Sequence, residues 1–158
     1  MTAIMKQGAA SNFSFIEPMK TLPVRDLPSG DWVYEMKFDG YRALAFKAGK
    51  EVRLISRNRI DFGNDYPQLI DALKLLTPRN VIIDGEIAAL DSEGKTSFQL
   101  LQSYGIRKNI PLVYYAFDLL NLEGTDLRSR PLTELLSPIG RSVAAAHPAS
   151  VVRPLAAT

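Results

Sequence analysis

Two strand-forming runs, residues 41–47 and 51–56, are separated by only three residues, and this spacing constrains the fold more than any other feature of the sequence. Both runs contain the aromatic or β-branched residues that favour strands. The three-residue connection contains Gly49, which is typical of a β-hairpin. Residues 32–38 form a similar run that leads into the hairpin through Asp39-Gly40. Because neighbouring strands usually pair locally, the three runs predict an antiparallel meander.

Helices and further strands are predicted beyond the hairpin. Apolar residues at Leu69, Ile70, Leu73 and Leu76 have the spacing of one helix face, so a helix is expected over residues 66–76. The other expected elements are strands over 81–83, 87–90 and 112–117 and short helices over 97–103 and 132–136.

Composition narrows the chemistry that the chain can carry. The 158 residues, of which 46% are hydrophobic, indicate one globular domain. No cysteine is present and His147 is the single histidine, which excludes thiolate or histidine-rich metal centres and a cysteine nucleophile. The net charge of +2 is too small to indicate nucleic-acid binding on its own. No apolar run has the length of a membrane span and no signal peptide is present, so we expect a cytoplasmic protein without a membrane partner.

The ends of the chain differ from its middle. Residues 1–14 are expected to be flexible, and residues 15–136 to form the folded part. The last segment, 137–158, contains six alanines and three prolines but no acidic or aromatic residue. This composition predicts a poorly ordered tail.

The most informative short motif is Lys37-Phe38-Asp39-Gly40-Tyr41-Arg42. Side chains alternate along a strand, so Lys37 and Asp39 share a face. A lysine amine attacks an electrophile only if its pKa falls below the ordinary value of about 10.4, which a neighbouring cation or a metal achieves. The motif therefore suits a nucleophilic lysine beside an acid and Arg42. Taken alone, such a motif is more often a simple hairpin turn with solvated charges.

Three further stretches carry candidate site residues. Asp84 and Glu86 flank a glycine after an apolar strand, where carboxylates suit a hard cation such as Mg²⁺; the alternative is a tight turn. Phe117, near the end of a buried strand, is placed either to stack on a base or to pack in the core. Arg57 and Arg59 follow a strand and either hold phosphates or form a charged loop.

Taken in order, these stretches resemble the motifs of the covalent nucleotidyltransferases, and more narrowly those of ATP-dependent DNA ligases. The motifs are Lys37-x-Asp39-Gly40-x-Arg42, Ser56-Arg57-Asn58, Asp84-Gly85-Glu86 and Phe117-Asp118-Leu119-Leu120. The ligase domain of bacterial end-joining enzymes is resembled further by Phe15-Ile16-Glu17-Pro18-Met19, Trp32-x-x-Glu35-x-Lys37 and Gly124-x-Asp126-Leu127-Arg128-x-Arg130-Pro131-Leu132. The resemblance covers about residues 15–135. It implies an α+β fold, with antiparallel β-sheets and flanking helices around a nucleotide cleft, as in ATP-grasp-like adenylation domains.

The resemblance also implies a role for each matching residue. Lys37 would attack the α-phosphate of ATP to form lysyl-AMP, and Asp39 would orient and activate the amine. The nucleotide would be bound by Arg42 and Arg57 at ribose or phosphate, by Phe117 and Glu35 at adenine, and by Glu86 at ribose or the catalytic Mg²⁺ or Mn²⁺. The AMP would then pass to the 5′-phosphate of nicked or broken duplex DNA, whose 3′-hydroxyl completes the sealing. A Ku-like end-binding protein is an implied partner.

The sequence departs from the family pattern after Phe117-Asp118-Leu119-Leu120. The family has two later lysine-containing motifs that hold the triphosphate, but no lysine follows Lys108 here. We therefore expect a partial adenylation domain, either truncated, frameshifted or completed by a partner, with impaired activity of its own. The alternatives are a nucleotide-binding relic and a related RNA ligase or mRNA-capping guanylyltransferase.

Overall fold

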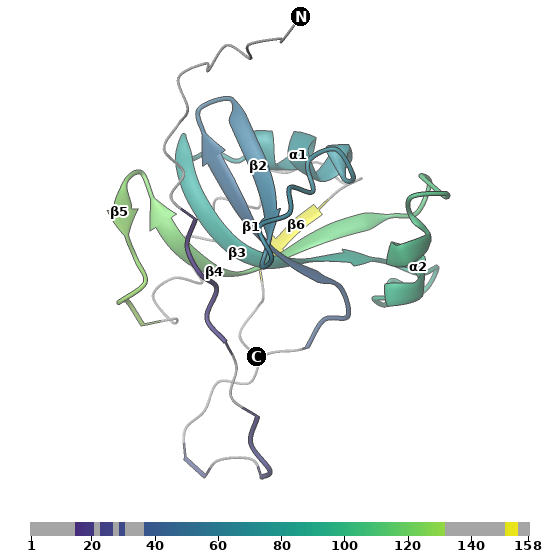
Figure 1. Cartoon of the computed structure of the whole chain (residues 1–158), viewed down its shortest axis with the longest axis horizontal. Helices are drawn as coiled ribbons and strands as arrows, with labels where there is room; N and C mark the ends of the chain where they lie inside the picture. The colour runs from purple at the N-terminus through teal and green to yellow at the C-terminus, as the bar shows by residue number, and fades with distance from the viewer. Residues whose placement is uncertain (1–14, 21–22, 27–28, 31–36, 132–150, 155–158) are drawn as a thin grey trace, which may run out of the picture.

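The computed structural model describes residues 15–20, 23–26, 29–30, 37–131 and 151–154 of the chain. Its strands form one sheet in the order β2-β1-β3-β4-β5, with β6 also paired to β4 (Figure 1). The strands are β1 (Tyr41–Ala48), β2 (Glu51–Ser56), β3 (Asn80–Ala89), β4 (Leu112–Leu122), β5 (Thr125–Asp126) and β6 (Val151–Pro154). The helices are α1 (Pro67–Lys74) and α2 (Phe98–Ser103). The pairings among the first five strands are all antiparallel, and helices accompany the sheet. The predicted α+β class is therefore confirmed.

The hairpin predicted over residues 41–56 is present as β1 and β2. The two strands remain in register down to the pair Ala48 and Glu51 next to the turn. Gly49 in this turn has φ +60°, a left-handed conformation that glycine adopts without steric cost. The hairpin therefore follows from local sequence alone.

The strand predicted over residues 32–38 lies mostly outside the described residues. Its last two residues, Lys37 and Phe38, are described and have no regular secondary structure. The partner of β1 on its second edge is β3, which comes later in the chain. Residues 37–40 therefore enter the sheet as an irregular segment that leads directly into β1.

β3 is one continuous strand through residues 84–86. The sequence suggested two apolar stretches, 81–83 and 87–90, and a tight turn was one alternative for the acidic residues between them. That alternative is wrong, because β1 and β4 pair with opposite edges of β3 and hold these residues extended. Both carboxylates of the motif therefore belong to the middle of a strand.

β4 is longer than the predicted 112–117 and is irregular where it faces β3. The register passes from Ile82–Asn121 to Ile83–Leu119 and from Asp84–Asp118 to Gly85–Ala116. Phe117 and Leu120 are therefore extra residues of β4, each forming a β-bulge. Bulges bend a strand and change the direction of its side chains, and here they occur beside the acidic residues of β3.

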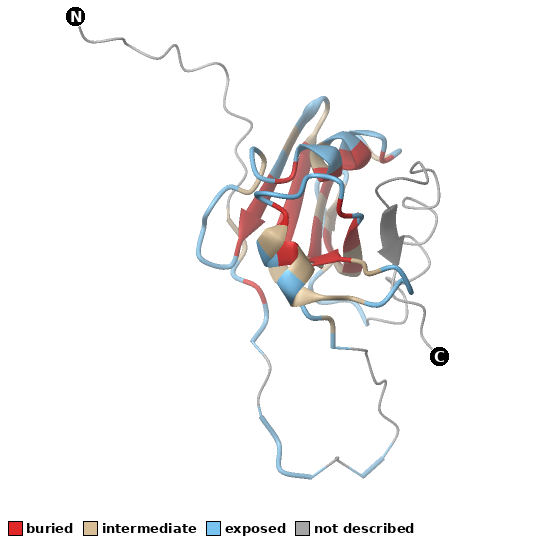
Figure 2. Cartoon of the chain, turned by 90° about the vertical axis from the view of Figure 1, so that its right-hand side faces the viewer, coloured by how far each residue is buried: buried red, intermediate tan, exposed pale blue. Residues whose placement is uncertain are grey.

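The sheet buries apolar side chains on both faces. Along β1, Leu44 and Phe46 belong to a small cluster on one face, and the alternate alanines belong to the larger cluster that α1 and α2 cover. Phe15 and Ile16 of the N-terminal segment pack against the small cluster. Buried residues are concentrated along the strands and the inner sides of the helices (Figure 2). The N-terminal segment and the helices thus cover opposite faces of the sheet.

Both helices lie within their predicted ranges. α1 occupies most of residues 66–76 and turns Leu69 and Leu73 into the core. α2 lies within residues 97–103, and the Ser97 hydroxyl caps it by accepting a hydrogen bond from the amide three residues later at 3.4 Å. The spacing of apolar residues was sufficient to predict both.

The segment 137–158, predicted as a tail, contains β6. The backbone of β6 pairs in parallel with residues 113–116 of β4, and the sequence did not predict this strand. The remainder of that segment, residues 1–14 and the predicted helix over 132–136 lie outside the described residues. In the part of the chain that the structure describes, every helix is too short or too polar to cross a membrane.

Candidate functional site

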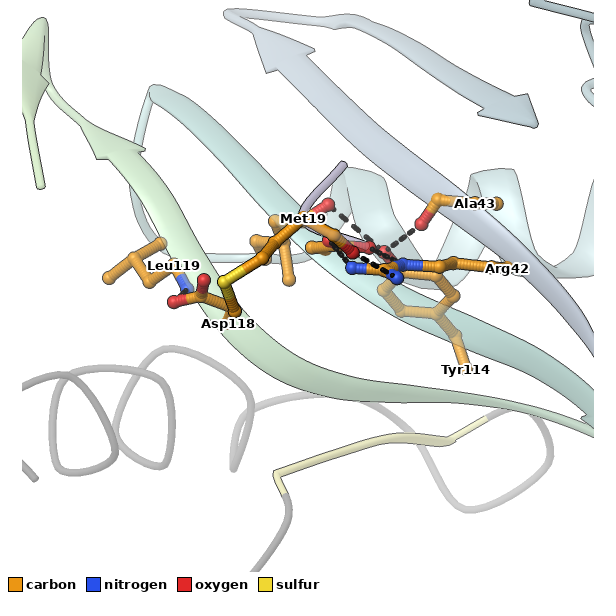
Figure 3. Close-up of polar contacts among 8 residues, drawn as sticks. Met19, Arg42, Ala43, Tyr114, Asp118 and Leu119 are labelled. Carbon is orange, nitrogen blue, oxygen red and sulfur yellow. Dashed lines mark hydrogen bonds and ion pairs between the residues drawn. The ribbon is translucent and has the colours of Figure 1, made fainter. Parts of the chain in front are cut away.

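An ion pair between Arg42 and Asp84 lies at the centre of the candidate site. The pairing of β1 with β3 places Arg42 opposite Glu86, with Asp84 two residues along on the same face. The guanidinium donates from Nε to Oδ1 at 3.1 Å and from Nη2 to Oδ2 at 2.7 Å (Figure 3). The Asp84 residue is only 2% exposed. The hydrogen bond to Asp84 is the main cause that raises the pKa of Arg42. The two bonds to Asp84 fix the position of the guanidinium.

Residues 15–20, here called the N-terminal strap, reach this ion pair. The carbonyl oxygen of Met19 accepts a hydrogen bond from Nη1 of Arg42 at 2.7 Å (Figure 3). At the other end of the strap, the Arg59 guanidinium lies 4.8 Å from the ring centroid of Phe15. The strap is thereby attached to β1 and to the loop after β2.

A close approach between Gly40 and β3 joins two of the sequence motifs. A Cβ atom at Gly40 would overlap the carbonyl oxygen of Ile87, so only glycine fits. The Gly40 amide favours the charged form of the Glu86 carboxylate, and the nearby charge of Asp39 disfavours it. Burial raises the pKa of Glu86, and the Arg42 charge and the Gly40 amide oppose this effect only in part.

Gly40, Arg42 and Glu86 border a cavity of about 560 Å³ that lies between the start of β1, the end of β2 and β3. Its charged and polar lining includes Arg42, Arg57, Asn58 and Glu86. Tyr41 and Phe62 contribute aromatic surface. Arginines bind phosphate oxygens and a carboxylate accepts hydrogen bonds from hydroxyl groups. The lining therefore suits a ligand that carries hydroxyl groups and phosphates.

The loop after β2 holds two of these residues at the cavity. Ser56 closes the loop twice, because its amide donates to the Ile60 carbonyl at 2.8 Å and its hydroxyl accepts from the Ile60 amide at 2.9 Å. Arg59 within the loop has φ +63°. The structure records no hydrogen bond or ion pair between Arg57 or Asn58 and another described residue. Their polar groups are therefore available to a ligand.

Phe117 contacts Arg42 and does not line this cavity. The Arg42 Cζ atom lies 5.3 Å from the centroid of the Phe117 ring, a cation–π geometry. Next to it on β4, the Tyr115 ring stacks on Phe38 with centroids 3.9 Å apart and planes 8° apart. The stacking of Phe117 on adenine stays a prediction.

The remaining predicted site residues precede β1. Lys37 and Asp39 are exposed and lie just before Gly40, which lines the cavity. Glu35 lies outside the described residues. The structure thus gathers Arg42, Arg57 and Glu86 around one cavity.

Asp84 is a site residue whose role the sequence did not reveal. The acidic motif named it as a carboxylate, but its partner Arg42 lies on another strand. Strand alternation over residues 84–86 is the signal that places Asp84 and Glu86 on one face. The choice of partner depends on the register of β1 against β3, which local sequence does not specify.

Tyr114 is a second residue that sequence reasoning missed. It is fully buried. Its hydroxyl donates toward two carbonyl oxygens, that of Ala43 at 2.8 Å and that of Ile83 at 3.1 Å. Burial raises the pKa of Tyr114 well above its usual value. A Cβ at Gly85 would lie 2.5 Å from Cζ of the ring, so this glycine makes the space that Tyr114 occupies.

Few carboxylates are available for a metal ion. The described residues contain no group of three or more His, Cys, Asp or Glu side chains placed to hold one. Glu86 faces the cavity, and Asp39 is near it. Since Mg²⁺ is commonly held by one or two carboxylates together with substrate phosphates, this donor set fits a magnesium ion bound jointly with a phosphorylated ligand.

A cavity lined by two arginines and a carboxylate beside an antiparallel sheet suits a phosphorylated ligand. The family model described as "ATP dependent DNA ligase domain" matches residues 16–152. The chain belongs to this ATP-dependent DNA ligase family.

Individual relatives agree with this assignment. The chain is 40% identical over 123 residues to the multifunctional non-homologous end joining protein LigD of Pseudomonas aeruginosa, a match that covers 76% of this chain and 14% of that protein. It is similar to the crystal structure of the ligase domain from Mycobacterium tuberculosis LigD, with a TM-score of 0.67 and 31% identity, over 79% of this chain and 39% of that one. A mycobacterial DNA ligase D complexed with ATP and MES gives a TM-score of 0.63 and 30% identity, over 78% and 38%. The predicted ligase-type adenylation fold is confirmed, and the chain spans well under half of these relatives.

Proposed function

We propose that this chain carries the ATP-binding, lysine-adenylating part of a DNA ligase that acts in end-joining repair. The contact between Gly40 and Glu86 is the observation that supports this most directly. It joins the lysine motif to the acidic strand motif at a cavity that Arg57 also lines. Family membership and the ATP complex of a structural relative support the choice of nucleotide.

In the proposed reaction, the neutral amine of Lys37 attacks the α-phosphorus of ATP. A nitrogen–phosphorus bond forms, the bond from the α-phosphorus to the bridging oxygen breaks, and pyrophosphate leaves with the electron pair. The proton of the attacking amine passes to Asp39 or to water. Arg57 would bind ribose or phosphate, and Arg42, oriented by Asp84, would neutralise developing phosphate charge.

The rest of the proposed site is assigned by analogy with the family. Phe117 and Glu35 would contact adenine, and Glu86 would contact ribose or a bound divalent cation. Mg²⁺ or Mn²⁺, when bound, would supply positive charge to the phosphates. Glu86 and Asp39 are the protein residues that would hold this cation.

In the later proposed steps, AMP passes from Lys37 to a DNA 5′-phosphate. The nitrogen–phosphorus bond breaks as a new phosphoanhydride forms. Attack by the DNA 3′-hydroxyl then forms a phosphodiester and releases AMP. The substrate is nicked or broken duplex DNA in the cytoplasm, and the end-joining relatives support a Ku-like end-binding protein as a partner.

The decisive experiment tests covalent labelling of the full chain. The protein is incubated with α-labelled ATP and Mg²⁺, denatured and separated by electrophoresis. We expect label on the parent chain and on Lys50→Ala, since Lys50 lies in the exposed turn between β1 and β2. We expect none on Lys37→Ala.

Three outcomes would contradict the proposal. An unlabelled parent chain that still binds ATP would indicate a nucleotide-binding relic without turnover. Labelling by α-labelled GTP in preference to ATP would indicate a capping guanylyltransferase. Sealing of a nicked RNA duplex but not of nicked DNA would indicate an RNA ligase.

A further inference from the structure

The N-terminal strap forms one wall of a second cavity, with a volume of about 420 Å³. Strap residues 17–20 line it on one side. Arg42, Arg57 and Asn58 line it on the other side, and these three residues also line the first cavity. The two cavities are therefore neighbours that share a wall.

Positive charge dominates this second cavity. Its lining contains Lys20, Arg42 and Arg57 against the single carboxylate of Glu17. Arg42 is already paired with Asp84, whereas Arg57 has no ion pair with another described residue. The available positive charge therefore comes from Lys20 and Arg57.

The ion pair of Lys20 is weak enough for a ligand to replace. Its Nζ lies 3.8 Å from Oε1 of Glu17, and the two side chains are 85% and 61% exposed. Exposed pairs of this kind contribute little to stability, because water and salt screen them. A phosphate group carries more charge than one carboxylate and offers several acceptor oxygens. It can therefore compete for Lys20.

The backbone that carries Lys20 is already positioned. Pro18 is buried, and the carbonyl of Met19 accepts the hydrogen bond from Arg42. Phe15 packs beneath Arg59 and against the apolar face of the sheet. Binding at Lys20 would thus order only a side chain, which lowers the entropic cost.

We infer that this second cavity binds a phosphate group and that Lys20 is one of its binding residues. The inference rests on the proposed function, which brings two phosphorylated molecules to the neighbouring cavity. The shared chemistry is a phosphate between Lys20 and Arg57, supplied either by ATP or by the DNA strand. Glu17 faces the same space and opposes binding.

The test compares two variants that change the charge in opposite directions. Lys20→Gln removes a cation and Glu17→Gln removes the opposing carboxylate, and both positions are exposed. Lys50→Gln, in the exposed turn between β1 and β2, is the matched control for loss of one positive charge. The probes are ATP, a nicked duplex with a 5′-phosphate and the same duplex with a 5′-hydroxyl. Dissociation constants are measured for the full chain over a range of KCl concentrations.

We expect Lys20→Gln to weaken binding of a phosphorylated probe roughly fivefold and Glu17→Gln to strengthen it by a similar factor. An effect on ATP alone would assign the phosphate to the nucleotide. An effect on the 5′-phosphorylated duplex would assign the phosphate to DNA. In that case the slope of log affinity against log salt concentration should fall in magnitude by about one in Lys20→Gln. Unchanged binding in both variants, weakening in both, or an equal loss in Lys50→Gln would overturn the inference.

Labelling by α-labelled ATP is measured on the same proteins. If the parent chain is not labelled but Lys20→Gln and Glu17→Gln still change binding of the probes in opposite directions, only the proposed function is contradicted. Intact labelling with unchanged binding in both variants would contradict only the phosphate site.

Discussion

The Tyr114 ring occupies the space beside Gly85 in which the Cβ of any other residue would lie. A Cβ at position 85 would overlap the Tyr115 carbonyl and lie 2.5 Å from the Tyr114 ring. The ring fills this space so that its hydroxyl can donate to carbonyl groups of β1 and β3. A single missing side chain between Asp84 and Glu86 thus lets three strands approach one another.

Gly85→Ala is therefore expected to destabilise the protein by about 1–3 kcal/mol, because the new methyl group forces the Tyr114 ring or β4 to move. Urea denaturation gives the free energy of unfolding. Gly105→Ala is the matched control, since a Cβ there meets no atom within 4 Å. Equal effects of the two substitutions would show that the space beside Tyr114 is not limiting.

The half-buried carboxylate of Glu86 should make stability depend on pH. Burial raises the pKa of Glu86 above its ordinary value of 4.5, so the folded protein holds this proton more tightly than the unfolded chain. Ionisation of Glu86 therefore costs stability as the pH rises from its ordinary pKa through its raised pKa in the folded protein. Below both values the group is protonated in both states and the cost is absent.

Glu86→Gln removes the charge but keeps nearly the same side-chain shape next to Gly40. We expect the variant to be more stable than the parent near about pH 8, and the difference to disappear near about pH 4. Urea midpoints across this range provide the measurement. Glu93→Gln, in an exposed turn, is the control, and a pH-independent gain at Glu86 would rule out desolvation of its charge as the cause.

At the scale of the elements, the site is a product of the register between β1 and β3. The register places Arg42 opposite Glu86 and within reach of Asp84. One ion pair thereby connects the start of one strand with the middle of another. Removing one partner leaves the other charge partly buried and unpaired, which costs more than losing an exposed pair.

Asp84→Asn is expected to destabilise the protein by about 2–3 kcal/mol, because it removes a charged acceptor from the Arg42 guanidinium. Adding Arg42→Met should cost less than the sum of the two single substitutions, since both charges then leave together. Denaturation of the four proteins in this cycle measures the coupling. Asp71→Asn, from the exposed pair with Lys74, should cost less than about 0.5 kcal/mol. Additivity of the Arg42 and Asp84 effects would show that the pair is not coupled.

Local patterns predicted the elements that depend on local contacts. The β1–β2 hairpin follows from a glycine turn, and α1 and α2 follow from the spacing of their apolar residues. β3 was predicted in two pieces and β4 only over its first part, because partner strands hold residues 84–86 extended and β4 continues through bulges at Phe117 and Leu120. β6 was missed because no apolar pattern marks it.

The candidate site was predictable in its residue types but not in its contacts. Arg42, Arg57 and Glu86 were named from motif spacing, and the structure places them around one cavity. The pairing of Arg42 with Asp84 required the register of a strand about forty residues away, which no local propensity encodes. The position of Tyr114 depended in the same way on the absence of a side chain on another strand.

At the scale of the whole molecule, β4 joins β6, at the C-terminal end of the described residues, to the rest of the sheet. It pairs with β3 on one edge, and with β5 and β6 on the other. Residues 113–116 of β4 are covered on that second edge by β6 alone among the described strands. Without β6, their backbone groups would form an open edge, which favours pairing with other chains.

A chain that ends at residue 150 should therefore be less stable by about 1–3 kcal/mol and should aggregate faster, because it lacks the backbone hydrogen bonds to β4. A chain that ends at residue 154 keeps β6 and is the control. Urea denaturation would measure the loss of stability, and light scattering at about 37 °C, below the usual melting range of mesophile domains, would measure aggregation. Identical behaviour of the two chains would show that β6 does not protect this edge.

The close approach of Gly40 to Ile87 also limits how this gene can vary. All other genetically encoded residues carry a Cβ, so every missense change of codon 40 introduces the same overlap, whatever the chemistry of the new side chain. A mutational scan should therefore find alanine and serine nearly as harmful as tryptophan at this codon. Codon 105, where a Cβ meets open space, should accept small residues readily.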